Sequence, residues 1–318
     1  MPTYGFKLMT ELHGPAALLR QARAAEEHGF GFLGISDHIH PWLDSHEHSP
    51  FAWSVLGAIA EVTESVELIT MVTCPTGRYH PAVVAQMAAT IGVMSDGRFT
   101  LGLGTGELLN EHVTGRRWPT SDERQEHLGE VIEAIQSLYE GGFRSYRGRH
   151  VDIVDTRIYD LPDTPVPLAI AAGGPRAATL AGSAGVGLVA TDADSSIVEA
   201  FTAAGGDRAR TYTEVSLAWH QDEDEGRRLA HERFRFGALG WTVLPELPNV
   251  TNFVAATELL TPEQVGEQIP HGPDPKQHAD AIKEYLDAGF EHVAVLPVGD
   301  DLDGFLRFWD DELLPLLP

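Results

Sequence analysis

The stretch FLGISDHIHPW, residues 32–42, begins as a buried strand and ends in side chains that a strand does not need. Its first four residues offer no polar side to solvent, which is typical of a strand covered on both faces in a parallel sheet. Five polar or aromatic residues follow at once: Ser36, Asp37, His38, His40 and Trp42. We expect this tail to serve a site, because loops at the ends of rigid elements carry function.

Short apolar runs like this one recur along the chain. The other seven cover residues 4–9, 66–73, 99–106, 167–173, 186–191, 215–221 and 292–298. Helical patterns separate them; one opens at Pro15 and closes at Gly29, and another is capped by Ser121. Eight buried strands joined by helices predict an α/β fold, a (β/α)₈ TIM barrel. The alternative, an open dinucleotide-binding sheet, needs a Gly-x-Gly-x-x-Gly turn that does not follow residues 4–9.

The barrel pattern runs through the whole chain. We therefore expect one domain over residues 1–318, since no linker or repeat interrupts the pattern. Two stretches exceed ordinary barrel connections, about 143–166 and about 222–270, and long connections of this kind usually shape a site. The second contains an irregular segment from Trp241 to Phe253, and a last helical pattern covers residues 274–289.

Composition restricts the partners. Only 22 Lys and Arg stand against 47 Asp and Glu, a net charge of -25, which argues against a nucleic acid or an anionic membrane surface as partner. No apolar stretch approaches the roughly 18 to 20 residues of a membrane span, and the stretch MPTYGFKLMTELHG lacks the basic start and long apolar centre expected of a signal peptide. Cys74 is the single cysteine, which fits a reducing compartment. We expect a cytoplasmic protein with a small-molecule substrate.

Polar residues gather where five successive strands end. In a barrel these ends share one face, where reacting groups lie. The residues at these ends are Asp37 and His38; Thr73, Cys74 and Pro75; Thr105, Gly106, Glu107 and Asn110; Gly173 and Gly174; and Thr191. Their clustering predicts an active site at the carboxyl ends of the strands.

His38 is the candidate general base, because an imidazole takes up and returns a proton near neutral pH. Asp37 could set its tautomer, although neighbours on a strand end point to opposite faces and need not touch. Trp42 either packs or holds its indole above a planar cofactor with the N–H directed at a substrate oxygen.

Two glycine-containing motifs favour a bound ligand. In GLGTGELLN, residues 102–110, the glycines let the backbone approach a ligand closely, unless they only turn a corner. In AAGGPRAATLAG, residues 171–182, Gly173, Gly174 and Pro175 precede a helix whose free N–H groups and dipole suit a phosphate, and Arg176 adds a charge. An ordinary strand-to-helix turn is the other interpretation of this second motif.

Three classes of function follow from these residues. A dehydrogenase would use His38 to remove a hydroxyl proton as hydride leaves for a cofactor. A metal-dependent hydrolase would use His38-x-His40 as ligands, but the pair follows the second strand and no matching aspartate completes it, so we expect no metal. A binding protein would need no proton-transfer residue. We favour the dehydrogenase.

Four motifs in order then match a known family: SDHIHPW at 36–42, TCPTGRYHPAVVAQ at 73–86, GLGTGELLNE at 102–111 and AAGGP at 171–175. The chain resembles the deazaflavin-dependent (LLM class) branch of the bacterial-luciferase-like oxidoreductases, and within it the glucose-6-phosphate dehydrogenases that use coenzyme F420. The resemblance implies a barrel with insertions, F420 as cofactor and usually a homodimer. A luciferase-like monooxygenase that uses flavin mononucleotide (FMN) is the alternative, since the same barrel serves both cofactors.

The resemblance also implies roles for residues. His38 is the expected base, Trp42 holds the developing oxygen anion, Glu107 is a proton donor to the deazaflavin and Glu11 is a further site carboxylate. A cis peptide, Met71–Val72, is expected to support the deazaflavin. The expected cofactor contacts are Asp37, Met71, Val72, Cys74, Thr105, Gly106, Asn110, Ala172, Gly173, Gly174, Pro175 and Arg176. Cys74 is expected to pack rather than act as a nucleophile.

The chain departs from the family where the sugar phosphate binds. Thr191 is kept, but Asp194 and Gln268 stand where the family has a lysine and an arginine, and 222–270 contains no lysine. Carboxylates at Asp192 and Asp194 would repel a phosphate.

We therefore predict a neutral alcohol or carbonyl substrate rather than glucose 6-phosphate. The candidate substrate contacts are Thr191, Trp241, Leu244, Leu247 and Phe253. The anionic tail of the cofactor itself would need a local anchor, for which Arg176 and the 173–175 N–H groups are candidates, with Arg78 and Arg116 as further ones.

Overall fold

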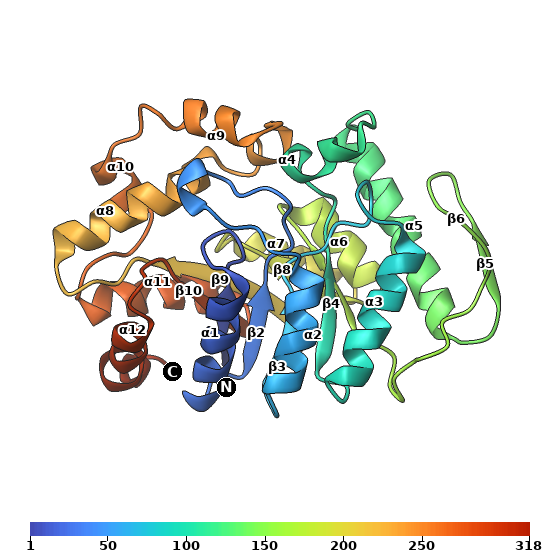
Figure 1. Ribbon diagram of the computed structural model, residues 1–318, viewed down its shortest axis with the longest axis horizontal. Helices are drawn as coiled ribbons and strands as arrows, with labels where there is room; N and C mark the ends of the chain where they lie inside the picture. Colours follow the sequence, from blue (N-terminus) through green and yellow to red (C-terminus); the bar gives the residue numbers. More distant parts are fainter.

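Eight parallel strands close into a barrel in the computed structural model, which describes all 318 residues (Figure 1). The predicted (β/α)₈ barrel is confirmed. Its strands are β1 (Thr3–Leu8), β2 (Phe32–Ile35), β3 (Glu67–Thr70), β4 (Phe99–Leu103), β7 (Leu168–Ala171), β8 (Gly187–Ala190), β9 (Thr211–Leu217) and β10 (His292–Pro297). Phe6 of β1 lies opposite Leu33 of β2 and Val295 of β10, and this double pairing closes the ring.

Eight helices alternate with these strands and cover the barrel. They are α1 (Pro15–Glu27), α2 (Ala52–Val62), α3 (Pro81–Met94), α5 (Ser121–Tyr139), α6 (Pro175–Ser183), α7 (Ser195–Ala203), α11 (Pro275–Ala288) and α12 (Leu302–Phe308). Proline opens four of them, because its fixed φ suits the first helical position and the missing N–H would be unbonded there. Buried apolar residues of these helices and of the strands form one core cluster.

The predicted cap of α5 is wrong by one residue. Thr120, not Ser121, accepts a hydrogen bond from the Glu123 N–H, and the Glu123 carboxylate accepts one from the Thr120 N–H at 2.8 Å. Such a capping box needs an acidic or amide residue three positions after the cap, which Thr120 has and Ser121 lacks.

The strand predicted at 215–221 begins four residues earlier, at Thr211. Thr211 and Thr213 are fully buried although their side chains are polar, so this part of the strand has no apolar run. Glu214 is also polar and ion-pairs with Lys7 of β1 across the barrel interior.

Both predicted insertions lie outside the barrel (Figure 1). In the first, β5 (Arg144–Arg147) and β6 (Asp152–Thr156) form a hairpin beyond α5. The second contains α8 (Glu223–Phe234), α9 (Val250–Ala256) and α10 (Pro262–Gly266). The segment expected to be irregular, 241–253, is partly helical, since α9 begins at Val250.

The second insertion contacts the opposite side of the barrel end. The short α4 (Leu108–Glu111) follows β4, and in the connection from α4 to α5 Trp118 donates to Glu246 at 3.0 Å. Arg124 of α5 donates to the same carboxylate at 3.0 Å and lies over the Trp118 ring. The insertion is thereby held across the end of the barrel.

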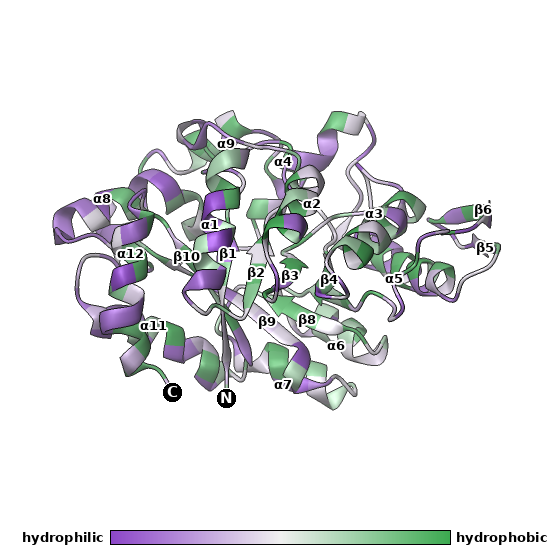
Figure 2. Cartoon of the chain, turned by 60° about the horizontal axis from the view of Figure 1, so that its bottom comes forward, coloured by the Kyte–Doolittle hydropathy of each residue, from purple (hydrophilic) through white to green (hydrophobic).

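Hydrophobic residues lie along the strands, as the green colouring of β3 and β8 in Figure 2 shows, while the outer helix α8 is largely hydrophilic. None of the helices combines the length and the apolar character that a membrane span requires.

Candidate active site

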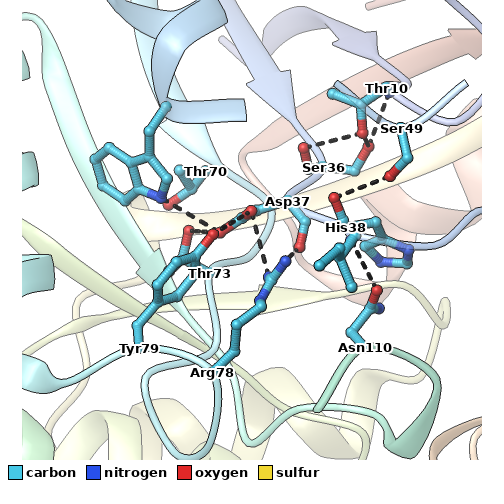
Figure 3. A network of polar contacts seen from close by, with 12 residues as sticks. Thr10, Ser36, Asp37, His38, Ser49, Thr70, Thr73, Arg78, Tyr79 and Asn110 are labelled. Atoms are coloured by element: carbon cyan, nitrogen blue, oxygen red, sulfur yellow. Dashed lines mark hydrogen bonds and ion pairs between the residues drawn. The ribbon is translucent and has the colours of Figure 1, made fainter. Parts of the chain in front are cut away.

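His38 lies among polar side chains at the carboxyl end of the barrel, three residues after β2 (Figure 3). Its imidazole Nδ1 is 3.1 Å from Oε1 of Glu11, and its Nε2 is 3.6 Å from Oε2 of Glu107. The side chain is 10% exposed. The ends of β1, β2 and β4 thus bring together three of the residues expected to act in catalysis.

Glu11 is buried and fixed by hydroxyl groups. Its Oε2 accepts hydrogen bonds from Ser36 Oγ at 2.6 Å and from Thr10 Oγ1 at 3.1 Å. Burial alone would raise the pKa of Glu11, but the His38 charge and the Ser36 hydrogen bond outweigh it and lower the pKa. An ionised carboxylate beside Nδ1 favours a proton on that nitrogen, which leaves Nε2 free to exchange one.

Asn110, in the first turn of α4, connects two loops of the site. Its Oδ1 accepts hydrogen bonds from the N–H groups of Ile39 at 2.9 Å and His40 at 3.3 Å (Figure 3). Its Nδ2 donates to Glu107 Oε2 at 3.0 Å. Both ends of the Asn110 amide therefore have protein partners, so the residue orients His38 and Glu107 rather than presenting a free amide.

Trp42 forms an aromatic wall beside His38. The rings of His38 and Trp42 lie 4.8 Å apart, and Trp42 stacks on Phe236 with centroids 4.9 Å apart. Phe253 contacts the edge of Trp42 at 5.2 Å and is fully buried. Phe253 supports Trp42 from behind, and its place in a substrate wall stays a prediction. Leu244 is buried in the same cluster.

Asp37 does not touch the His38 ring but fastens the loops behind it (Figure 3). Its carboxylate accepts hydrogen bonds from Thr73 at 2.8 Å, Tyr79 at 3.1 Å and Trp53 at 3.3 Å. Arg78 lies 3.3 Å from the same carboxylate and also donates to the Asp37 carbonyl. Because its carboxylate points to these partners, Asp37 does not set the tautomer of His38, and its contact with the cofactor stays a prediction.

The peptide bond Met71–Val72 after β3 is cis, as expected. Lys7 donates to the Met71 carbonyl at 3.1 Å and pairs with Glu214. Glycines on β4 leave room for this segment: a Cβ atom at Gly102 would collide with the Thr70 carbonyl, and one at Gly104 would lie 2.6 Å from Val72. These two glycines thus serve strand packing, not ligand approach.

Three further expected cofactor contacts lie near this segment. Cys74 is buried, and burial, followed by the charges of Glu107 and Glu111, raises the pKa of its thiol, which agrees with a packed side chain and not a nucleophile. Thr105 accepts a hydrogen bond through its carbonyl from Thr76, and Gly106 has φ 87°, a conformation that favours glycine.

The turn after β7 has the predicted form. Ala172 is buried, and Gly174 and Pro175 begin α6 without any side-chain cap, so the first N–H groups of the helix are free for an anion. Gly173 lies against Trp241. Arg176 is 62% exposed and pairs with Asp122, so its charge is already partly balanced within the protein.

Trp241 reaches across the barrel end to Thr191. Its indole Nε1 donates to Thr191 Oγ1 at 2.5 Å, and the residue is 36% exposed. Nearby, burial and then the charge of Asp194 raise the pKa of Asp192, while Asp194 caps α7 through the Ser196 N–H. The half of the barrel end beyond β7 therefore carries two carboxylates and one exposed indole.

Sequence reasoning missed Glu111. This carboxyl is 4% exposed, lies between Gly77 and Gly106, and accepts a hydrogen bond from the Arg78 N–H. Burial raises the pKa of Glu111 to about 7, although Arg78 acts in the opposite direction. The only signal in the sequence was its place at the end of GLGTGELLNE.

The two histidines of the His38-x-His40 pair have different partners. His40 stacks on His112 with centroids 5.4 Å apart, while His38 contacts Glu11 and Glu107. The chain contains no group of three or more histidine, cysteine or acidic side chains arranged to hold a metal ion.

Comparison with known proteins identifies the family. Residues 4–292 match the family described as luciferase-like monooxygenase. The F420-dependent glucose-6-phosphate dehydrogenases of Microbacterium testaceum and Kribbella flavida are 36% and 38% identical, over 99% and 98% of this chain and 97% of each relative.

A solved structure is also similar over the whole chain. It is an F420-dependent secondary alcohol dehydrogenase in complex with an F420-acetone adduct, with a TM-score of 0.90 at 25% identity, covering 100% of this chain and 99% of that chain. The resemblance drawn from the four motifs is confirmed. The chain belongs to the luciferase-like monooxygenase family, and the relatives named here depend on F420.

Proposed function

We propose that this protein is an F420-dependent oxidoreductase that interconverts a neutral alcohol and its carbonyl compound, with His38 as the general base. The observation that carries this proposal is the His38 imidazole held between Glu11 and Glu107 at the barrel end. The named relatives, which depend on F420, support the choice of cofactor.

The residues present fit this cofactor. The uncapped start of α6 at Gly174 and Pro175 offers N–H donors suited to a phosphate, and Val72 and Gly106 lie at neighbouring strand ends. When bound, the deazaflavin of F420 accepts or returns a hydride. The protein's own side chains perform every other step of the reaction.

His38 moves the proton. In the oxidising direction Nε2 accepts the hydroxyl proton as the C–H bond gives up its hydride, so the alcohol loses two electrons and two hydrogens. Glu11, whose pKa is lowered, stabilises the imidazolium that forms. In the reducing direction the same nitrogen returns the proton to the carbonyl oxygen. Trp42, held against His38 by Phe236, is placed to steady that oxygen.

The substrate is proposed to be uncharged. Asp192 and Asp194 lie beside Thr191, and the insertion at 222–270 supplies no lysine. A phosphate there would meet carboxylates and no paired cation. This separates the chain from its glucose-6-phosphate dehydrogenase relatives in substrate, not in cofactor.

A fluorescence titration of the purified protein with F420 and, in parallel, with FMN is the test. We expect micromolar binding of F420 alone, and a kcat/KM for the best secondary alcohol at least tenfold above that for glucose 6-phosphate. Preference for FMN would move the assignment to a monooxygenase. Equal turnover of the sugar phosphate would contradict the proposed substrate but not the cofactor.

The homodimer and the cytoplasmic location stay predictions. Size-exclusion chromatography with light scattering measures the first, and a value near the 34.6 kDa of one chain would contradict it.

A further inference from the structure

A pocket with a volume of about 240 Å³ lies beside the candidate active site. Four segments line it: the loop 75–81 after β3, Arg116, His127 of α5, and His150 with Val151 at the β5–β6 hairpin. None of its lining residues is acidic, although 47 of the 318 residues of the chain are. Three histidines and two arginines border it instead. We call it the Arg78–His150 pocket.

Two buried nitrogen atoms of this pocket lack hydrogen-bond partners. They are Arg78 Nε, on a side chain 9% exposed, and His150 Nε2. The nearest carboxylate oxygens, from Glu111 and Glu126, are 3.8 Å and 3.6 Å away, beyond hydrogen-bond distance. Arg78 Nε always carries a proton, and His150 Nε2 carries one in the Nε2–H tautomer or in the imidazolium. A buried donor without an acceptor is costly, so a ligand that brings an acceptor oxygen would stabilise this arrangement.

The carboxylates around the pocket already accept hydrogen bonds from the protein. Asp37 holds Arg78, Thr73 and Tyr79, and Glu130 accepts the N–H groups of residues 149–151. Glu126 accepts from Arg149 at 2.9 Å. Glu111 Oε2 accepts from the Arg78 N–H, while its Oε1 has no hydrogen-bond partner and lies 3.8 Å from Arg78 Nε.

His127 and His150 stack in the pocket with ring centroids 5.3 Å apart. Burial, and then the charge of His150, lowers the pKa of His127 to about 4, so its imidazole is neutral at pH 7. A bound anion would favour the protonated ring and raise that pKa.

The wall of the pocket is also the back of the active-site loops. Thr76 donates to the Thr105 carbonyl at 2.9 Å. Arg78 donates to the Asp37 carbonyl at 2.8 Å, as Figure 3 shows. Glu111 fills the space between Gly77 and Gly106. The pocket is therefore one side chain away from residues expected to contact the cofactor.

We propose that the Arg78–His150 pocket binds the carboxylate or phosphate group of a small anionic ligand. Two ligands share this chemistry: the anionic tail of F420, which rests on the proposed function, and a separate small anion, which does not. The exposed Arg116 at the rim and the buried donors of Arg78 and His150 would receive the anion.

The first experiment compares F420 with the deazaflavin riboside that lacks phosphate and glutamates, by fluorescence titration. The variant is R116Q with H150Q, and the matched control is R149Q, which removes a neighbouring charge that does not line the pocket. If the tail is the ligand, the double variant raises the Kd for F420 about tenfold and leaves the Kd for the riboside unchanged. The control leaves both Kd values unchanged, and thermal melting verifies that each variant is folded.

The second experiment titrates inorganic phosphate, and separately triglutamate, into the protein while the ring protons of His127 and His150 are followed by NMR. A saturable shift in the wild type that is lost in the double variant, together with an unchanged Kd for F420, supports a separate anion. No shift, together with an unchanged Kd for F420, overturns the proposal. If neither F420 nor the riboside binds the wild type, the proposed function fails, and the phosphate titration still decides on the pocket.

Discussion

The two halves of the barrel end are built differently. In the half after β1 to β4, which we call the catalytic half, the carboxylates of Glu11 and Asp37 and the amide of Asn110 are buried and hydrogen-bonded. In the half after β7 to β9, the insertion half, Trp241 is 36% exposed and Asp194 is exposed. The comparison teaches that the polar groups around His38 are held by buried hydrogen bonds, while the surface expected to select the substrate is made of exposed side chains that can change at little cost in stability.

The largest expected effect comes from removing the base of the catalytic half. His38→Ala should lower kcat about 1,000-fold, because a general base contributes roughly 10² to 10⁴, while the Kd for F420 changes less than about threefold. His40→Ala is the control, since its ring stacks on His112 away from the two carboxylates. Steady-state kinetics decides, and a drop of less than about tenfold for His38→Ala would reject the assigned role.

The next effect concerns stability and comes from the buried ion pair of Asp37 and Arg78 in the same half. Asp37→Asn should lower the free energy of unfolding by about 2–3 kcal/mol, because Arg78 loses its buried counter-charge. Asp122→Asn, which breaks the exposed pair with Arg176, should cost less than about 0.5 kcal/mol. Urea unfolding measures both, and equal losses would show that the two halves do not differ in this respect.

Glu111 makes the catalytic half sensitive to pH. Its folded pKa, about 7, is raised above the ordinary value of 4.5, so its stabilising contribution is complete below pH 4.5 and is lost as the pH rises through 7. Glu111→Gln should therefore stabilise the protein by about 2 kcal/mol at pH 8, with little difference near pH 5. Melting temperatures between pH 5 and 8 test this, with the exposed Glu64→Gln as control; parallel wild-type and Glu111→Gln curves would contradict it.

The smallest effect belongs to the insertion half. Replacing Asp194 by lysine and Gln268 by arginine should raise kcat/KM for glucose 6-phosphate about fivefold, since it removes one repulsive charge and adds two cations. The loss of the α7 cap should cost about 1 kcal/mol of stability. The activity toward a neutral alcohol is the internal control, and an equal rise in both activities would contradict a charge-based choice of substrate.

The barrel could be predicted because its strands are continuous apolar runs. The motifs placed His38 and Glu107, and the family resemblance placed Glu11, at strand ends that the fold brings together. The direction of a side chain could not be predicted in the same way. Phe253 is fully buried behind Trp42 because α9 turns it inward, and Asp37 points away from His38 into the loop after β3.

The burial of polar residues could not be predicted from the sequence either. The start of β9 was missed because Thr211 and Thr213 are polar yet fully buried, and Glu111 was missed because only the folded loops 75–81 and 105–111 enclose it. Such burial depends on partners far away in sequence, which no local pattern contains.

The ion pair of Lys7 and Glu214 bears on how the barrel is assembled. The two residues are 207 positions apart, on β1 and β9, and Lys7 is 4% exposed. In the closed barrel the Lys7 ammonium is buried, and a buried charge without its partner is strongly unfavourable. The pair therefore links the first strand to one that lies about two thirds of the way along the chain, so the charge of Lys7 is balanced in the barrel interior only when these distant parts of the sequence come together.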